Sequence, residues 1–347
     1  MSFDPNFENQ PLPEVEITMT EEERRSHRSV FSRVCIAFLV YLLLTNLLSV
    51  AAVFACNALD PELLESYNIS LLMSAGIQYV IGLPIFILMM RKIPAARPAA
   101  NSLGGKRFFK YALVSMTMMY AGNYISTMIM MYMDELLGIV PEDSLGDMLG
   151  GTNILLSLVI VGIIGPIVEE IMFRKLFIDR LTPYGEVIAI FFPAVIFGLF
   201  HGNLYQFFYA TFLGAAFGYI YLRSGKLIYS TLLHMFINTF CGVFPTVIMG
   251  MFDYDEFLEI LETGAVTPEY VEANALALAL LLIYEFVVLS MVFGGIFMIV
   301  RNIMTLRLRR GEVTFPRGKT LETLLFNVGA IALITVSVII MAINTFS

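Results

Sequence analysis

Nine apolar runs, separated by short polar connections, occupy most of this chain. A helix needs roughly 20 predominantly apolar residues to cross a bilayer, and most of the runs approach or exceed that length. They cover residues 34–56, 70–90, 111–132, 153–177, 187–201, 205–222, 227–249, 275–300 and 323–343. Charged residues make up only 14% of the 347 residues, against roughly 25% in soluble domains. The pattern predicts an all-α, polytopic integral membrane protein with about nine transmembrane helices.

The basic residues alternate with the acidic loops along the chain. All 21 Lys and Arg lie before the first run or around the connections that follow the second, fourth, sixth and eighth runs. The loops on the opposite side, residues 60–65, 134–147 and 253–272, contain acidic residues and no Lys or Arg. Because short cytoplasmic loops are enriched in Lys and Arg, we predict a multi-pass protein of the cell membrane with a cytoplasmic N-terminus and an external C-terminus.

The N-terminal part differs from the rest in composition. Residues 1–30 are polar and acid-rich, so we expect a partly disordered cytoplasmic segment without a cleavable signal peptide, followed by a membrane domain over residues 31–347. Thr20 and Glu23 form a capping-box pattern, which predicts a helix start that runs on into the first apolar run. The net charge of −8, with no basic domain, argues against nucleic acid as a partner. The lipid bilayer is the expected surrounding.

Ionisable side chains inside the apolar runs need a physical reason, because such a group near the centre of a bilayer costs about 2.5–3.5 kcal/mol. Glu169 and Glu170 lie in the fourth run, His201 ends the fifth and His234 lies in the seventh. With a rise of about 1.5 Å per residue, Glu169 lies roughly 18 Å from the cytoplasmic end of its helix. Glu285, in the eighth run, has no visible partner, and we interpret it as packed or facing a water-filled cavity.

Side chains four positions apart share one face of a helix, which pairs the polar residues of these runs. Glu170 and Arg174 have this spacing and are predicted to form an ion pair. Glu169 is turned about 100° away from Glu170, so we predict that its carboxylate stays available as a general base. His234 and Asn238 also share a face.

Small residues mark places where helices bend or approach closely. Gly165 and Pro166 come just before the acidic pair and predict a bend that opens an intramembrane cavity. Gly214 and Gly218 have GxxxG spacing, which predicts close helix packing. Only residues 202–204 separate the fifth and sixth runs, which predicts a helical hairpin.

Three short motifs occur in order in successive parts of the apolar pattern. They are Glu169-Glu170-Ile-Met-Phe-Arg174, Phe197-Gly-Leu-Phe-His201 and His234-Met-Phe-Ile-Asn238. They resemble the EExxxR, FxxxH and HxxxN motifs of the CAAX protease and bacteriocin-processing (CPBP, or Abi) family of intramembrane proteases, which includes the type II CAAX prenyl endopeptidases. The resemblance covers about residues 150–245, the expected catalytic core. The flanking runs match only as hydrophobic helices.

The resemblance implies an intramembrane endopeptidase of the CAAX type, with a bundled or conical helical core around an intramembrane cavity. It implies that Glu169 and His201 activate water, and that His234 and Asn238 polarise the scissile carbonyl and hold the oxyanion. The partner it implies is a membrane-embedded protein or peptide substrate, and the sequence does not select a prenylated or an unmodified one. The residues that would support the site are Glu170, Arg174 and Phe197.

Two other functions and one cofactor stay open. Buried Glu and His side chains also relay protons in transporters, and an inactive relative of the family would act in bacteriocin self-immunity. A metal-free mechanism is favoured, because Asn238 is a poor zinc ligand and a good oxyanion donor. The alternative is a catalytic zinc, which usually has three protein ligands. These would be Glu169, His201 and His234.

Overall fold

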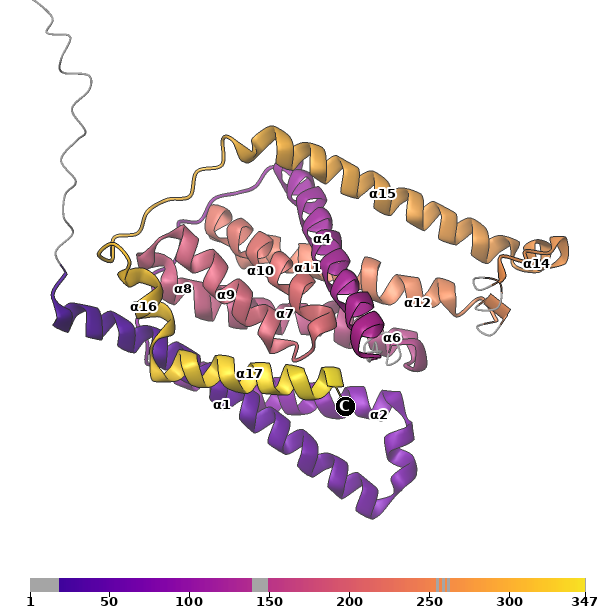
Figure 1. Cartoon of the computed structure of the whole chain (residues 1–347), viewed down its shortest axis with the longest axis horizontal. Coiled ribbons are helices and arrows are strands. Elements are labelled where there is room, and N and C mark those ends of the chain that lie inside the picture. The colour runs from indigo at the N-terminus through magenta and orange to yellow at the C-terminus, as the bar shows by residue number, and fades with distance from the viewer. Residues whose placement is uncertain (1–18, 139–148, 254–255, 258–259, 261–262, 347) are drawn as a thin grey trace, which may run out of the picture.

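The computed structural model describes residues 19–138, 149–253, 256–257, 260 and 263–346. Within these residues the regular elements are all helices (Figure 1), and six helices are long and apolar enough to cross a membrane. They are Glu21–Leu59, Tyr67–Met90, Ile154–Tyr184, Leu227–Met249, Ala275–Ile303 and Val328–Phe346. The chain is therefore an all-α, polytopic membrane protein, as the apolar runs predict.

Three of the six helices are built from consecutive α and π segments. A π segment inserts one extra residue per turn and shifts the face that later side chains occupy. The π segments are η3, η4, η5 and η7, whereas η2 and η6 are 3-10 helices.

The helices of the described residues are, in chain order, α1 (Glu21–Leu59), η2 (Pro61–Glu65), α2 (Tyr67–Ala75), η3 (Gly76–Gly82), α3 (Leu83–Met90), α4 (Gly105–Leu137), α6 (Ile154–Ser157), η4 (Leu158–Ile164), α7 (Gly165–Glu170), η5 (Ile171–Ile178), α8 (Asp179–Leu181), η6 (Thr182–Tyr184), α9 (Glu186–Phe200), α10 (Leu204–Ser224), α11 (Leu227–Ile237), η7 (Asn238–Val243), α12 (Phe244–Met249), α14 (Pro268–Ala273), α15 (Ala275–Ile303), α16 (Lys319–Leu325) and α17 (Val328–Phe346).

The other three predicted runs are also helical. Residues 111–132 lie within α4, residues 187–201 cover most of α9, and residues 205–222 lie within α10. None of the three is among the six helices that are long and apolar enough to cross a membrane, so the count of nine spans stays a prediction. The predicted hairpin is confirmed: α9 and α10 pack together, and Gly202 adopts a φ of +66° in the turn between them.

The ninth predicted run, residues 323–343, begins before the helix that the structure shows, α17. Residues 323–343 do not form one helix, because Phe326 leaves the helical conformation at φ −87° and ψ 58° and separates α16 from α17. The Asn327 side chain then accepts a hydrogen bond from the backbone N–H of Ala330 at 2.9 Å. An Asn in this position is a strong helix-start signal. This signal is hidden in the sequence because the flanking residues, Phe326 and Val328, are apolar and extend the hydrophobic run.

The N-terminal helix begins where the capping box predicts. The backbone N–H of Glu23 donates to Thr20 Oγ1 at 3.2 Å, and the backbone N–H of Thr20 donates to the Glu23 carboxylate at 2.9 Å. These two bonds satisfy helix-end donors outside the apolar run. The predicted disorder falls mainly on residues 1–18, which lie outside the described residues.

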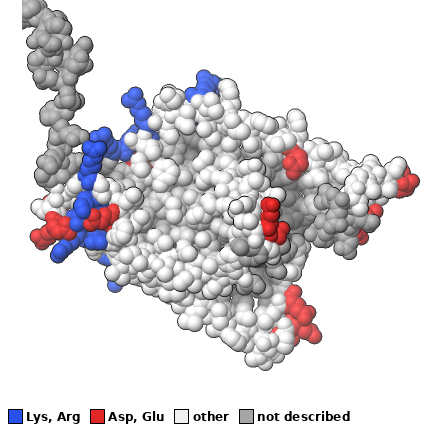
Figure 2. Space-filling view, in the orientation of Figure 1, with Lys and Arg blue, Asp and Glu red and all other residues white. Residues whose placement is uncertain are grey.

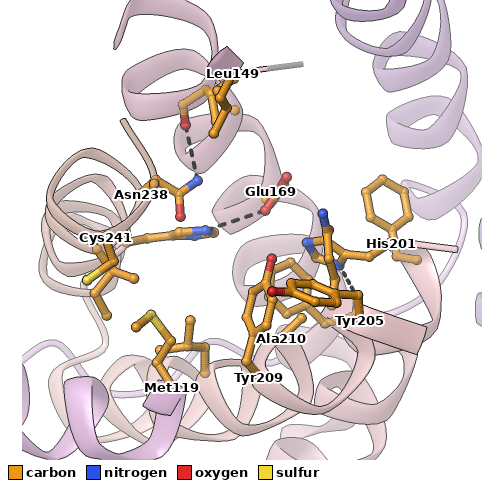
Figure 3. Close-up of a pocket in the computed structure, with 18 of the residues that line it drawn as sticks. Met119, Leu149, Glu169, His201, Tyr205, Tyr209, Ala210, Asn238 and Cys241 are labelled. Carbon is orange, nitrogen blue, oxygen red and sulfur yellow. Dashed lines mark hydrogen bonds and ion pairs between the residues drawn. The ribbon is translucent and has the colours of Figure 1, made fainter. Parts of the chain in front are cut away.

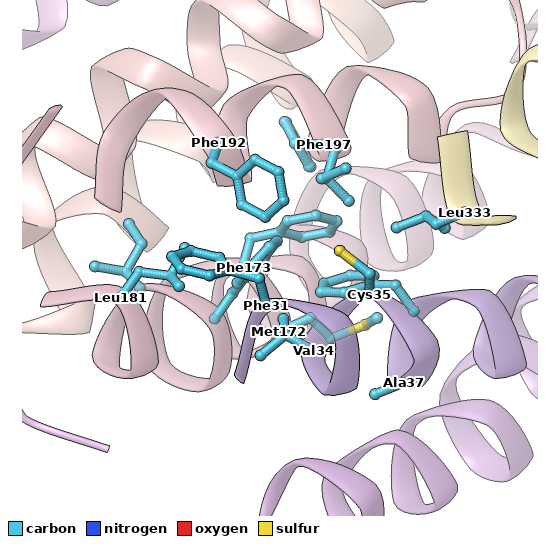
Figure 4. Close-up of a cluster of buried hydrophobic side chains, with 14 of the residues drawn as sticks. Phe31, Val34, Cys35, Ala37, Met172, Phe173, Leu181, Phe192, Phe197 and Leu333 are labelled. Atoms are coloured by element: carbon cyan, nitrogen blue, oxygen red, sulfur yellow. The ribbon is translucent and has the colours of Figure 1, made fainter. Parts of the chain in front are cut away.

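An aromatic core joins α1 to η5 and α9 (Figure 4). The Phe38 ring lies 5.0 Å from the Phe173 ring and 4.9 Å from the Phe177 ring, between centroids. Phe31 meets Phe192 edge-on at 5.9 Å. All five side chains are buried. Since lipid tails are as apolar as these rings, the stabilisation comes from close van der Waals packing between helices.

Glycines allow α10 to lie directly against its neighbours. A Cβ atom at Gly214 would stand 3.0 Å from the Cα of Ala194, and one at Gly218 would stand 3.3 Å from Cδ1 of Ile178. The close packing predicted for this GxxxG pair is confirmed. The turn before α10 is covered by α17, whose Asn344 side chain donates to the carbonyl oxygen of Gly202 at 2.8 Å.

The charges separate along the molecule (Figure 2). At one end of the visible face Lys and Arg gather together with some acidic residues, around the start of α1 and around α16. The opposite end, around α2 and α14, shows Asp and Glu without Lys or Arg. The alternation of basic and acidic connections in the sequence is thus a two-ended charge distribution in space.

Candidate active site

The acidic pair lies on a short helix held between two π segments. Glu169 and Glu170 end α7, with η4 before it and η5 after it. The backbone N–H of Gly165 donates to the carbonyl oxygen of Ile160, in the π pattern. The carbonyl oxygen of Val161 would bond the next N–H in that pattern, but residue 166 is a proline and has none.

A side chain from another helix takes up this free carbonyl group. Asn238, the first residue of η7, donates its Nδ2 to the carbonyl oxygen of Val161 at 3.1 Å. The bend expected at Pro166 is therefore tied to the third sequence motif. This bond uses one of the two amide hydrogens of Asn238.

The predicted ion pair is present and fully buried. Nη2 of Arg174 lies 3.0 Å from Oε1 of Glu170, and neither side chain is exposed. The guanidinium carbon lies 5.1 Å from the centroid of the Phe197 ring and 5.6 Å from that of Phe217. Aromatic faces attract a desolvated cation, so two rings and one carboxylate hold this arginine in place.

His234 bridges the two glutamates, a contact that helical spacing did not predict. Its Nδ1 lies 3.1 Å from Oε1 of Glu170, and its Nε2 lies 3.5 Å from Oε2 of Glu169. The ring packs on Phe217 at 5.0 Å between centroids and is almost wholly buried. Helical spacing offers no partner for Glu169, whereas in the structure the His234 imidazole lies beside its carboxylate.

His201 follows directly after α9, and its tautomer is set by the backbone. Nδ1 of His201 lies 2.9 Å from the carbonyl oxygen of Phe197. A carbonyl oxygen only accepts hydrogen bonds, so Nδ1 carries the proton and Nε2 of the neutral ring keeps its lone pair. The Phe197 ring also supports the imidazole edge-on, at 4.9 Å between centroids. The FxxxH spacing thus fixes both the position and the proton of the histidine.

These groups meet at one cavity of about 740 Å³ (Figure 3). Glu169, His201, His234 and Asn238 all line it, although they come from three separate helical regions. Glu169 is 18% exposed, whereas Glu170 is fully covered behind it. The cavity predicted from the bend in the fourth run is therefore present, with all four residues expected to be catalytic on its wall.

The wall contains further polar side chains that the sequence analysis did not single out. They come from η3 and its neighbour α2, from α4, from α10 and from α12. A signal was present for two of them: Ser74 and Gln78 are four positions apart, and the Gln78 amide donates to the Ser74 hydroxyl at 2.8 Å. The neutral polar lining residues include Ser74, Gln78, Asn123, Tyr205, Gln206 and Thr246.

Glu285 does not take part in this site. It lies on α15, is exposed, and is not among the residues that line the cavity. The α15 helix packs mainly against α4, where the hydroxyl of Thr117 donates to the carbonyl oxygen of Val292 at 2.9 Å. Glu285 is therefore not packed inside the described helices, and the interpretation that it packs or faces a water-filled cavity stays a prediction.

The donor set for a catalytic zinc is incomplete. In the part of the chain that the structure describes, no group of three or more His, Cys, Asp or Glu side chains is placed to hold a metal ion. Glu169 and His234 lie close together, but His201 does not complete a ligand set with them. Three protein ligands are usual for catalytic zinc, so the residues as placed do not fit the zinc alternative.

The segment that holds the site is similar to a known protein family. Residues 151–240 match the family described as type II CAAX prenyl endopeptidase Rce1-like. This segment holds all three motifs, so the resemblance inferred from them is confirmed over that part of the chain. No solved structure matches the chain.

Two bacterial proteins are similar to part of the chain. The "Putative membrane peptidase YdiL" of Bacillus subtilis (strain 168) is 32% identical over 108 residues, which is 30% of this chain and 41% of that protein. The "UPF0177 protein YxdF" of Lactococcus lactis subsp. lactis (strain IL1403) is 27% identical over 124 residues, which is 35% of this chain and 68% of that protein. The match thus spans less than half the length of the first relative.

Proposed function

We propose, from the relationship of residues 151–240 to the Rce1-like endopeptidases and from the cavity that they help to line, that this chain is an intramembrane endopeptidase. It would hydrolyse a peptide bond of a membrane-associated protein or peptide. The observation that carries the proposal is the meeting of Glu169, His201, His234 and Asn238 on the wall of one cavity. The name of the Bacillus relative, a membrane peptidase, supports the same class of activity.

The first requirement of such a reaction is a base that takes a proton from water. His201 offers Nε2, because its Nδ1 proton is held by the carbonyl oxygen of Phe197. Glu169 offers a carboxylate that is the more exposed of the acidic pair. We assign these two residues to the attacking water, which loses its proton to them as its oxygen bonds to the carbonyl carbon. The proton then passes to the leaving amine.

The second requirement is a donor for the negative oxygen that develops on the carbonyl group. Glu169 and Glu170 bring two negative charges, and Arg174 supplies one positive charge. His234 lies between the two carboxylates, with Nδ1 3.1 Å from Oε1 of Glu170 and Nε2 3.5 Å from Oε2 of Glu169 at the cavity. His234 and the second amide hydrogen of Asn238 are the donors that we assign to the oxyanion.

Glu170, Arg174 and Phe197 support these groups without contacting the substrate bond. The buried ion pair fixes Nδ1 of His234 through a shared carboxylate oxygen, Oε1 of Glu170. Phe197 contributes a carbonyl oxygen to His201 and a ring face to Arg174. Supporting bonds of this kind keep catalytic side chains within the narrow range of geometry that the reaction needs.

The proposed mechanism does not require a metal ion, because side chains of the described residues supply the base and the hydrogen-bond donors. The alternative, a zinc ion bound by Glu169, His201 and His234, is tested directly by metal analysis. Prenyl-dependent, CAAX-type specificity is an alternative to cleavage of an unmodified segment, and the comparisons do not decide between the two, because the relatives match over only part of their length. A transporter or an inactive immunity protein remains as an outcome of the experiment.

The test compares the termini of membrane-associated peptides from cells with the wild-type protein and cells with Glu169→Gln. We expect new N-termini that appear only with the wild-type protein. The Glu285→Gln variant is the matched control, because it removes a carboxylate outside the cavity, and it should give the wild-type pattern. An identical set of termini in all three strains would contradict the proposed function and favour a transporter or an inactive immunity protein.

A further inference from the structure

The cavity is lined from one end of the molecule only. In the second membrane helix the lining residues run from Leu71 to Tyr79, and none comes from the end of α3 that leads to Arg91 and Lys92. In the helix that contains Glu169, the lining begins at Ile160 and stops at Glu169 itself. The basic ends of both helices are therefore outside the cavity wall.

The other helices show the same direction. On α10 the lining residues lie between Tyr205 and Leu213, in the half that begins at the hairpin turn. From α11 to α12 they run from His234 to Thr246, toward the loop that begins near Asp253. On α4 they are residues 119–123, beyond the basic first turns of that helix. Among the described residues that line the cavity, none comes from a connection that carries Lys or Arg.

The opposite end of the cavity is closed by packed side chains. Behind Glu169 lie Glu170 and Arg174, both without exposed surface. Beyond them lies the aromatic core, in which Phe173 and Phe177 are completely buried (Figure 4). A peptide reaching Glu169 from the basic end would have to displace this core.

The basic end of the molecule is assigned to the cytoplasm by the enrichment of Lys and Arg in cytoplasmic loops. We propose that the cavity opens toward the extracytoplasmic half of the membrane, and that the substrate is a polypeptide segment lying in that half. Only the identification of this segment as a substrate rests on the proposed function. The direction in which the cavity opens does not depend on catalysis.

The chemistry of the open part specifies the segment further. Its polar side chains are neutral amides and hydroxyls, such as Ser74, Gln78 and Asn123, and among the described residues that line the wall Glu169 is the acidic one. Neutral donors and acceptors pair with backbone groups, and these are free only where the peptide is not helical, since a helix satisfies its own backbone. The segment is therefore extended at the scissile bond and poor in charged side chains. A prenylated end on the cytoplasmic side would meet the closed face.

The direction of opening can be tested by thiol labelling in intact cells. In a background without the native cysteines Cys35, Cys56 and Cys241, single cysteines are introduced as Ser74→Cys and Thr246→Cys in the cavity wall. Ala265→Cys, in an acid-only loop, and Ser102→Cys, in a basic connection, are the references, and both positions are exposed. A membrane-impermeant maleimide is added before or after permeabilisation, and each variant also carries Glu169→Gln so that labelling is independent of turnover.

We expect both cavity cysteines and Ala265→Cys to be labelled in intact cells, and Ser102→Cys only after permeabilisation. Labelling of the cavity cysteines together with Ser102→Cys would overturn the proposal, as would no labelling in either state while both references react. Folding of each variant is checked by the retention of a single detergent-soluble species.

The proposed position of the substrate is tested by a separate measurement. Cleavage sites that depend on Glu169 should map to the extracytoplasmic halves of membrane proteins, and sites in cytoplasmic halves would overturn the proposed position. External labelling without any Glu169-dependent site would leave the direction of opening intact and refute the proposed function instead.

Discussion

Asn238 donates its side-chain amide to the carbonyl oxygen of Val161, a residue 77 positions earlier in the chain. The bond exists because Pro166 has no N–H to offer that carbonyl group. It joins the helix that holds Glu169 to the helix that holds His234, beside the cavity. Asn238 therefore has a structural role that can be measured separately from its proposed role with the oxyanion.

A double-mutant cycle separates the two roles. Asn238→Ala should lower the free energy of unfolding by about 1 kcal/mol, because it removes a hydrogen bond to a part-buried carbonyl group. Pro166→Ala restores an N–H, so Asn238→Ala should cost less stability in that background. The measurement is unfolding of the purified protein in detergent. Additivity of the two changes to within about 0.5 kcal/mol would mean that the positions are uncoupled.

Removal of the carboxylate on the cavity wall should stop the reaction without unfolding the protein. Once a cleaved peptide is known, Glu169→Gln should lower kcat/KM by at least about 100-fold, the smaller end of the range for a general base. His201→Ala should do the same. Glu285→Gln should keep wild-type kcat/KM. Retention of most activity by Glu169→Gln would show that the base is another group.

The buried arginine should be needed mainly for stability. Arg174→Ala leaves Glu170 as an uncompensated buried charge, and breaking such a pair costs about 3–5 kcal/mol. We expect a matching fall in unfolding free energy and in the yield of folded protein. The double variant Glu170→Gln with Arg174→Met should recover part of the loss, because it removes both charges. If Arg174→Ala were as stable as the wild type, the pair would be unimportant.

The contact between α16 and α1 should depend on pH. Hydrogen bonding from Lys319 and from Arg24 lowers the pKa of Glu322 from its ordinary value of 4.5 to about 2. Because the folded-state pKa is the lower one, this carboxylate contributes stability fully above about pH 4.5 and loses it as the pH falls toward 2. Wild type should exceed Glu322→Gln in stability at pH 6, with the difference shrinking below pH 4.5. A difference that is independent of pH would contradict the assignment.

The metal question has a direct measurement. In the proposed mechanism, purified active protein should contain no stoichiometric zinc and should keep its activity through a chelator titration. Elemental analysis of the same preparation provides the control. Stoichiometric zinc, with activity lost on its removal and regained on its return, would assign Glu169, His201 and His234 as ligands instead.

The helical class and the contacts within single helices were predictable because both depend on local patterns. The length of the apolar runs predicts the membrane helices. The i,i+4 spacing predicts the pairing of Glu170 with Arg174 and the contact of His201 with Phe197. The contact of His234 with both glutamates was not predictable, because it depends on how two distant helices are rotated, and π segments change that rotation. The break at Asn327 was missed for a different reason: a capping signal of one residue was outweighed by the apolar residues around it.

The hydrogen bond from Asn344 to the carbonyl oxygen of Gly202 has a consequence for biosynthesis. The turn that follows His201 is synthesised more than a hundred residues before the helix that covers it. During insertion into the membrane, His201 and the turn after it therefore lack the hydrogen bond from Asn344 until α17 has left the ribosome. A nascent chain at that stage holds all four residues proposed to be catalytic but lacks the contact from α17 to the turn beside His201.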